Sequence, residues 1–464
     1  MEYLVRLIQI HETFRKPELE ALAELVSVGL EIVYYHDSSP FCIIRLPSPA
    51  AARALITRSI LSAGIYELWG SGTDYASLHV SVRTRTAAFW PSYKTTSFRF
   101  TLDGFQGKRS TATQRALIES FSYMGFDGPI LMNGAELQLC VFEEYALRAP
   151  GAAVEEPRQL YLGRFITASG RAAVTKYDLK KRAYISTTSM DAELALVTAN
   201  LALAAPGKLM YDPFVGTGGF PLACAHFGAM AIGSDIDGRS IRGKNGMGVI
   251  SNFVQYRLLG NYGDCFVADL TNTPMREGRW LDGIVCDPPY GVREGLKVLG
   301  NKDGKGTEAV YVDGKLAHLP KGSMLTSVLL HDKRQDGFVP PKRPYSFEAM
   351  LDDILEFASV MLVDDARLSM WMPTANDEDI ELAIPTHPCL EIVSVCVQAF
   401  NKWSRRLLTY RRIPDSEVDS TAVQQRREYS SGIHANDLNS FRRKYFEGFK
   451  VPNGDTQSNG APLP

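Results

Sequence analysis

A fold class is first indicated by the segment Leu209-Met-Tyr-Asp-Pro-Phe-Val-Gly-Thr-Gly-Gly219. The apolar residues before Asp212 predict a short strand, and residues 221–227 predict a helix. Glycines at a strand-to-helix turn allow the backbone to approach a ligand closely. The pattern therefore predicts the first strand, turn and helix of a doubly wound α/β domain, although a lone glycine-rich turn is weak evidence.

The next apolar run, residues 230–234, predicts a second strand that ends at Asp235-Ile-Asp237. An acidic residue roughly 20 positions after the first glycine-rich turn is where such domains bind ribose hydroxyls. Together the two elements predict a nucleoside cofactor. They do not separate a methyltransferase from a nicotinamide enzyme, which shares both.

A third element, Asp287-Pro-Pro-Tyr-Gly291, follows the apolar run 284–286. Pro288 and Pro289 fix φ and make the turn rigid. The Asp287 carboxylate and the Pro288 carbonyl can then accept both hydrogens of one flat amino group, while Tyr290 offers a face on which a base stacks. This predicts chemistry on an exocyclic amino group, for which a nicotinamide enzyme has no use. A strand-end turn with these residues by chance is the alternative for the four letters alone.

In this order the motifs resemble the class I S-adenosylmethionine-dependent amino-methyltransferases. More closely, the chain resembles the catalytic subunits of eukaryotic tRNA (guanosine-10-N(2))-methyltransferases, a THUMP-containing family. The matching segments are TTSMDAELA at 187–195, DPFVGTGG at 212–219, GSDID at 233–237 and DPPYGVREG at 287–295. The resemblance extends from residue 1 to about residue 445.

This resemblance implies S-adenosylmethionine as the cofactor and the 2-amino group of guanosine 10 in tRNA as the target. It also implies an RNA-binding N-terminal region and an obligate heterodimer with a small zinc-binding activator protein, which would hold the only zinc. The residues expected at the site are Asp287, Pro288, Pro289 and Tyr290 for catalysis, and Thr188, Ser189, Met190, Asp212, Phe214, Gly216, Gly218, Asp235, Asp269 and Asp287 for the cofactor.

Two of these assignments have structural alternatives. Asp269 is expected to accept from the adenine amino group, but it follows a predicted strand and fits a strand-end turn or a helix cap equally well. Residues 188–190 are expected to close over the cofactor, and with Glu193 nearby they also fit a helix N-cap. A cap and a ligand contact can share a residue.

The N-terminal half predicts an α+β region made of a ferredoxin-like lobe, residues 1–80, and a THUMP-like lobe, residues 81–172. Pro17 is expected to start the first helix, and Ser48-Pro49 to open another. Basic residues that could hold RNA phosphates, or form ordinary solvated clusters, are Arg83, Arg85, Lys108, Arg109, Lys180, Lys181 and Arg182.

Residues 173–415 predict the Rossmann-like methyltransferase domain, with a mixed seven-stranded sheet that closes in an antiparallel hairpin, residues 391–400 with 407–411. The polar, glycine-rich stretch 296–345 is expected to be a mobile active-site loop. Residues 416–464 form a C-terminal extension, expected to be mostly disordered towards its end.

Composition agrees with this interpretation. The length of 464 residues suggests two or three domains, and 45% hydrophobic residues support an ordinary core. A formal charge of −2 argues against a chain that coats nucleic acid with its whole surface, but it allows a local basic patch. The seven cysteines form no Cys-x-x-Cys pair, so no metal and no disulfide framework is expected, and a cytoplasmic location is favoured. No 18-residue apolar run or secretion signal is present, so no membrane association is expected.

Other functions remain open at this point. The same motif order serves DNA adenine or cytosine methyltransferases and rRNA guanine methyltransferases, and the chain could also be a non-catalytic RNA-binding scaffold. For the partner, the apolar segments 249–254 and 265–268 could lie near an exposed sheet edge, which is a template for strand addition, or they could be interior.

Overall fold

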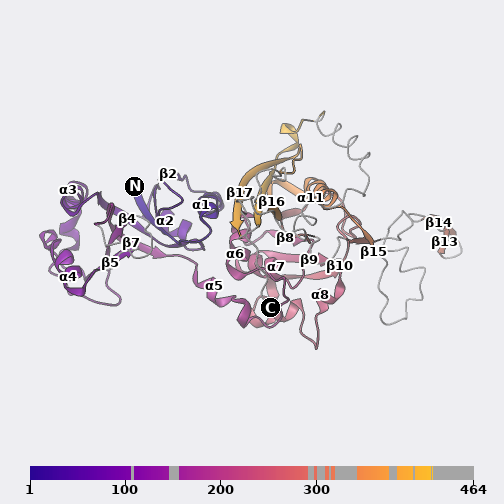
Figure 1. The fold of residues 1–464 in the computed structure, drawn as a ribbon, viewed down its shortest axis with the longest axis horizontal. Coiled ribbons are helices and arrows are strands. Elements are labelled where there is room, and N and C mark those ends of the chain that lie inside the picture. The colour runs from indigo at the N-terminus through magenta and orange to yellow at the C-terminus, as the bar shows by residue number, and fades with distance from the viewer. Residues whose placement is uncertain are drawn as a thin grey trace, which may run out of the picture. The chain divides into compact units, whose positions relative to one another are not determined.

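The computed structural model describes residues 1–105, 109–145, 156–290, 297–299, 309–312, 315–318, 342–375, 384–400, 403–419 and 421. The chain divides into two compact units. The first comprises Met1–Gly207 and Leu222–Ala229, and the second comprises Lys208–Pro221 and Met230–Pro464. Each unit contains one seven-stranded sheet, and Figure 1 labels their elements along the chain.

The sheet of the first unit has the strand order β2-β3-β1-β4-β7-β6-β5. Its neighbours are antiparallel except for β5 and β6, which are parallel. Strands β4 and β7 are long and pair with each other, so the two predicted N-terminal lobes share one sheet. The strands are β1 (Glu2–Leu7), β2 (Glu31–Tyr34), β3 (Phe41–Arg45), β4 (Ser62–Gly72), β5 (Phe98–Phe105), β6 (Leu137–Glu144) and β7 (Gln159–Ala168).

The apolar clusters of this unit include three that link its strands and helices. One contains Leu22 of the first helix with Val5, a second contains Trp69 with Leu139, and a third contains Leu4 with Phe142. The third cluster packs residues of both predicted lobes together. The helices are α1 (Glu12–Leu25), α2 (Pro49–Ile56), α3 (Tyr75–Thr86), α4 (Thr111–Glu119), α5 (Ala172–Lys176) and α6 (Ala192–Leu201), and the 3-10 turns are η1 (Ala87–Tyr93), η2 (Ser122–Met124) and η3 (Leu179–Lys181).

Of the two predicted helix starts, one is confirmed and the other is wrong. Ser48 caps α2, because its hydroxyl accepts from the Ala51 amide while Pro49 occupies the first turn, as predicted. The expectation that Pro17 starts α1 is wrong, since this helix begins at Glu12 and Pro17 lies inside it. Phe14 is buried on the same face as later residues of the helix, so the apolar stripe begins before the proline.

The sheet of the second unit has the order β10-β9-β8-β11-β16-β18-β17. The first five strands in this order, β10, β9, β8, β11 and β16, are parallel. Strand β18 is antiparallel to β16, and β17 is antiparallel to β18. This confirms the predicted mixed seven-stranded sheet and its closing hairpin. The strands are β8 (Leu209–Asp212), β9 (Met230–Asp235), β10 (Tyr262–Val267), β11 (Leu281–Cys286), β16 (Leu362–Ala375), β17 (Leu390–Ala399) and β18 (Trp403–Arg412).

Helix α11 (Phe347–Met361) supplies much of the core of this unit. Its Leu351 and Ile354 pack with Ile284 of β11 and Leu368 of β16. Ser346 caps the helix, accepting from the Ala349 amide. The other helices are α7 (Gly219–His226), α8 (Gly238–Arg242) and α9 (Val249–Tyr256), with 3-10 turns η4 (Leu259–Asn261) and η5 (Asp415–Glu417).

Most of the predicted loop 296–345 and of the extension 416–464 falls outside the described residues. Within the loop the structure describes two short antiparallel pairs, β12 (Lys297–Leu299) with β15 (Lys342–Pro344) and β13 (Ala309–Val312) with β14 (Lys315–His318). In the ranges described above, no helix has the length and apolar character needed to cross a membrane.

Candidate active site

Three acidic residues meet at one edge of the second sheet. Asp212 ends β8, Asp235 ends β9, and Asp287 directly follows β11. These strands are parallel neighbours in the order β9-β8-β11, so Asp212 lies between the other two. The carboxyl ends of parallel strands are the usual ligand-binding edge of a doubly wound sheet.

The three carboxyl groups influence one another. Burial raises the pKa of Asp212 well above its ordinary value, and the nearby charges of Asp235 and Asp287 raise it further. Burial also raises the pKa of Asp235 and of Asp287. Neighbouring carboxylates repel one another, and a bound cation offsets this repulsion. This edge of the sheet therefore suits a positively charged ligand.

The glycine-rich turn is built around two of these carboxylates. Asp212 Oδ1 accepts from the Phe214 amide over 2.9 Å, and Asp235 Oδ2 accepts from the Gly216 amide over 3.0 Å. Gly216 and Gly218 both have positive φ, 50° and 80°. A Cβ at Gly216 would meet only the Phe214 carbonyl at 3.9 Å, so this turn has open space beside it.

Gly218 is needed for a different reason. A Cβ there would lie 2.6 Å from Val249 Cγ1 at the start of α9, which is closer than real Cβ contacts allow. Gly218 therefore lets α9 pack against the turn, whereas Gly216 leaves room for a ligand. The sequence pattern treated the two glycines alike.

The Asp287 turn brings together the carboxylate and the tyrosine predicted to act on the substrate. The Tyr290 hydroxyl donates to Asp287 Oδ1 over 2.5 Å. Pro288 is buried and Pro289 is exposed. The Tyr290 ring lies edge-on to Trp403, with centroids 6.4 Å apart. Tyr290 thus orients the carboxylate, a role that the sequence did not suggest.

Sequence reasoning also missed Arg405. Its Nη1 lies 3.9 Å from Asp287 Oδ2, and both side chains are partly buried. Arg405 belongs to β18, opposite Pro373 of β16, and β16 pairs with β11. Because this neighbourhood arises from the order of three strands, no local signal in the sequence could have found it.

The remaining cofactor candidates have defined local roles. Asp269 Oδ1 accepts from both the amide and the hydroxyl of Thr271, which is the turn named above as the alternative. In the first unit, Ser189 Oγ accepts from the Ser186 amide, Thr188 Oγ1 lies 3.1 Å from Ser186 Oγ, and Met190 is buried. The cap of α6 is Asp191, which accepts from the Leu194 amide.

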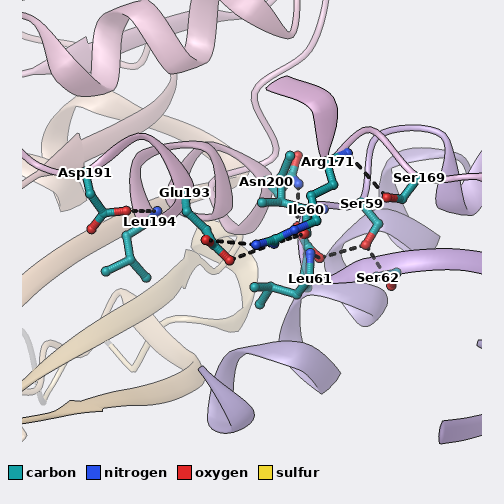
Figure 2. A network of polar contacts seen from close by, with 11 residues as sticks. Ser59, Ile60, Leu61, Ser62, Ser169, Arg171, Asp191, Glu193, Leu194 and Asn200 are labelled. Carbon is teal, nitrogen blue, oxygen red and sulfur yellow. Dashed lines mark hydrogen bonds and ion pairs between the residues drawn. The ribbon is translucent and has the colours of Figure 1, made fainter. Parts of the chain in front are cut away.

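The first turn of α6 is tied to the N-terminal region through Arg171, which follows β7. Figure 2 shows the Arg171 side chain directed at Glu193, with Nη1–Oε1 and Nη2–Oε2 distances of 2.8 and 3.2 Å. Arg171 Nη1 also donates to the Ile60 carbonyl over 2.9 Å. Glu193, expected near a helix cap, therefore serves as the partner of Arg171.

Comparison with known proteins agrees with this geometry. A family model described as "Tmrp11 THUMP N-terminal domain" matches residues 1–171, and one described as "RMKL-like, methyltransferase domain" matches residues 180–301. The tRNA (guanine(10)-N(2))-methyltransferase of Saccharomyces cerevisiae is 41% identical, over 97% of this chain and 99% of that protein. The Schizosaccharomyces pombe enzyme is 36% identical over 96% of each, and human TRMT11 is 32% identical over 96% and 95%.

The chain belongs to this family of tRNA methyltransferases. The resemblance predicted from the motifs is confirmed, as are the THUMP-containing N-terminal region and the Rossmann-like methyltransferase domain. The chain spans nearly the full length of these relatives, so the family assignment covers both parts of the molecule.

The residues of this methyltransferase fit S-adenosylmethionine, which is a cation. Three features support this fit: the group of three carboxylates, the open space at Gly216, and the position of Asp235 at the end of the second strand. All three lie at the ligand-binding edge of the sheet.

Most of the predicted RNA-contact residues in the N-terminal lobes already have partners within the protein. The Arg83 guanidinium lies 3.9 Å from the centroid of the Tyr123 ring, and it is exposed. Arg85 pairs with Glu2 over 2.9 Å, and Arg109 pairs with buried Glu143 over 2.7 Å. Lys108 lies outside the described residues.

The predicted basic residues 180–182, which follow the first sheet, include both exposed and buried side chains. Lys180 and Lys181 are exposed, and Lys181 Nζ donates to the Thr175 carbonyl over 2.7 Å. Arg182 is buried and donates to the Tyr177 carbonyl. The exposed members of the predicted set, and not the buried one, have surface available for a phosphate backbone.

Proposed function

We propose that this protein transfers a methyl group from S-adenosylmethionine to the exocyclic 2-amino group of guanosine 10 in tRNA. The observation that carries this proposal is the full-length match to enzymes named for that reaction. The Asp287 turn at the carboxyl end of β11 supports it, because this turn offers acceptors suited to a flat amino group.

S-adenosylmethionine, when bound, supplies a methyl group that is already activated, so the protein needs no nucleophile of its own. We assign Asp212, Phe214, Gly216 and Gly218 to the methionine part and Asp235 to the ribose hydroxyls. Asp269 is assigned to the adenine amino group, and Thr188, Ser189 and Met190 to the segment that closes over the ligand.

The chain's own task at the substrate is to orient the amine. Asp287 Oδ1 is held by Tyr290, which leaves Oδ2 and the Pro288 carbonyl to accept the two amino hydrogens. Accepting both hydrogens draws the nitrogen lone pair out of conjugation with the guanine ring. Precise orientation of this kind contributes to catalysis by fixing reacting atoms in line.

The substrate selector is proposed to be the N-terminal region, with exposed Arg83 among its phosphate contacts, and exposed Lys180 and Lys181 directly after this region are proposed to add to them. Lys or Arg contacts to phosphates release counterions, so tRNA affinity should fall as salt rises. We also assign the protein to the cytoplasm, where its seven free thiols would stay reduced.

We further propose that the chain works as a heterodimer with a small zinc-binding activator protein. Strand β10 ends the sheet order, so it is an edge strand. On α9, one turn apart, Ile250 and Val254 are 49% and 55% exposed, and Leu259 after the helix is 49% exposed. An edge strand beside exposed apolar side chains is a template for strand addition by another chain.

The partner proposal is tested by expression. Expressed alone, the chain should be poorly soluble or weakly active, and co-expression with the activator should correct both. The double change Ile250→Ser and Val254→Ser should weaken the heterodimer and make the lone chain more soluble. A monodisperse and fully active lone chain would contradict the proposal.

The reaction itself is tested by nucleoside mass spectrometry of tRNA transcripts treated with the enzyme and S-adenosylmethionine. We expect N2-methylguanosine from a transcript with guanosine at position 10, and none from a matched transcript with adenosine there. Methylated adenosine or cytosine would favour another nucleic-acid methyltransferase, and an absence of transfer with intact tRNA binding would indicate a scaffold.

A further inference from the structure

The hairpin of β17 and β18 places a cation beside the predicted catalytic carboxylate. Arg405 Nη1 lies 3.9 Å from Asp287 Oδ2, while the Tyr290 hydroxyl donates to Oδ1 of the same carboxylate. The Arg405 side chain is only 16% exposed, so water screens this charge little.

Arg405 is itself held in place from several directions. Its Nε donates to Gln398 Oε1 on β17 over 2.6 Å. Its guanidinium carbon lies 4.7 Å from the centroid of the buried Trp371 ring and 5.7 Å from that of Phe400. A planar guanidinium stacked on aromatic rings keeps its orientation and loses little freedom when it pairs with a carboxylate.

The surroundings of Asp287 shift the pKa of its carboxyl group in opposite directions. Burial raises the pKa of the Asp287 carboxyl, while the Tyr290 hydrogen bond and the positive charge of Arg405 lower it. From β8, the Asp212 carboxyl interacts with Asp287 as a like charge. The buried Cys286 thiol, next to Asp287 in the chain, also senses its charge.

The charge of Asp287 decides whether it can act as proposed. An ionised carboxylate only accepts hydrogen bonds, whereas a protonated one presents a hydroxyl donor. A donor would face the amino hydrogens of guanine, which are donors themselves. Positive charge also develops on the amino nitrogen as it takes the methyl group, and an ionised carboxylate stabilises it.

We propose that Arg405 is a positioning residue that holds the Asp287 carboxylate in its charged form and in the orientation that accepts the guanine amino hydrogens. The inference rests on the proposed role of Asp287. It adds to the Asp-Pro-Pro-Tyr turn a residue that lies more than 100 positions later in the sequence, on β18, the strand next to β16.

The test is the pH dependence of single-turnover methylation by the complete enzyme, with its activator if required, at saturating cofactor and tRNA. Arg405→Gln should lower the rate at neutral pH by about 10-fold or more. It should also move the acid limb of the profile to higher pH, by about one unit, because Asp287 loses the charge that favours its ionised form. Arg405→Lys should keep the acid limb near that of the wild type and lose less rate.

Arg411→Gln is the matched control. Arg411 lies on the same strand and also pairs with acids, Asp365 and Glu391, but both of these acids are exposed. It should change neither the rate nor the acid limb. An Arg405→Gln variant with the wild-type profile would overturn the inference. If Arg405→Gln fails to fold, the Arg405→Lys variant provides the test. This variant keeps the positive charge, so an acid limb that shifts to higher pH in it would also overturn the inference.

Asp287→Asn, assayed in parallel, separates this inference from the proposed function. A fast Asp287→Asn enzyme would remove the assigned role of Asp287 and the inference with it. A slow Asp287→Asn enzyme together with an unaffected Arg405→Gln enzyme would leave the proposed function intact and contradict the inference alone.

Discussion

The side-chain amide of Asn200 in α6 donates to the carboxylate of Glu18 in α1 over 2.8 Å, and both side chains are fully buried. Glu18 also accepts from the Ser59 hydroxyl and from the amides of Ile60 and Leu61, each over 2.9 Å. Figure 2 shows Asn200 beside this Ser59–Leu61 segment. The bond joins the region matched by the THUMP model to the region matched by the methyltransferase model.

Other contacts reinforce the same junction within the first unit. Arg58 Nε donates to Asn200 Oδ1 over 2.9 Å, and Arg58 Nη2 donates to the Ala204 carbonyl over 2.7 Å. Helix α6 therefore belongs to the same compact unit as α1 and residues 58–61. The segment 188–190, which precedes α6, is built onto the region proposed to select the tRNA.

The first prediction concerns this junction. Glu18→Gln should lower the free energy of unfolding by at least about 2 kcal/mol, because a single amide oxygen cannot serve four buried donors. Chemical denaturation measures the change. Glu20→Gln on the same helix is the control, since Glu20 makes only an exposed pair with Lys16, and it should stay within about 0.5 kcal/mol of the wild type. Equal effects of the two changes would contradict the role of Glu18.

The second prediction concerns the proposed catalytic carboxylate. Asp287→Ala should leave cofactor affinity within a few-fold and lower the methylation rate by roughly 10²-fold or more, the scale for losing a polar contact made in the transition state. Single-turnover methylation and calorimetry measure the two quantities. Asp364→Ala, an exposed acid paired with Arg279, should leave both unchanged. Near wild-type turnover of Asp287→Ala would end the assignment.

The third prediction separates the two parts of Tyr290. Tyr290→Ala should weaken the contact with the target base by about 1–3 kcal/mol, which is the range for stacking on an aromatic ring. Tyr290→Phe keeps the ring but frees Asp287 Oδ1, so it should be milder and act on the rate more than on tRNA affinity. If Phe and Ala prove equally damaging in both measurements, the hydroxyl is the part that matters.

The fourth prediction concerns the cofactor. Asp235→Ala should raise the dissociation constant of S-adenosylmethionine by about 10- to 100-fold, since hydrogen bonds to a charged group contribute roughly 1.5–3 kcal/mol. Affinity for tRNA should hardly change. Calorimetry with each ligand decides between the outcomes, and an unchanged cofactor affinity would mean that Asp235 only shapes the turn through its bond with Gly216.

The fifth prediction follows from the raised pKa of Asp212. A carboxyl whose pKa is higher in the folded than in the unfolded state adds stability below the unfolded pKa, near 4, and loses it as the pH rises through the folded value. Asp212→Asn cannot ionise and keeps an oxygen for the Phe214 amide. Without cofactor, its melting temperature should exceed that of the wild type at pH 7, and the difference should shrink toward pH 4. A difference independent of pH would contradict this reasoning.

Elements whose signals are local could be predicted from the amino-acid sequence alone. A strand, a glycine-rich turn and a helix follow one another directly in residues 208–227. The Asp287 turn is likewise recognised from five consecutive residues, 287–291. Such patterns depend on backbone preferences and on the burial of neighbouring residues, both of which can be read along the chain. The closing hairpin was predictable for the same reason.

Strands β4 and β7 were not predicted, although they hold the two N-terminal lobes together. Their pairing shifts register between Ile65 and Tyr66 and again between Leu68 and Gly70. Each irregularity changes which face a side chain points to, so the regular alternation that reveals a strand is lost.

The pairs that join distant parts of the chain are visible only in the folded protein. Arg405 reaches Asp287 because β18 lies two strands from β11, and Asn200 reaches Glu18 because α6 packs on α1. Strand order and helix packing follow from how whole apolar faces are buried together. A charge or an amide therefore finds its partner only when the fold is complete, and no spacing in the sequence records it.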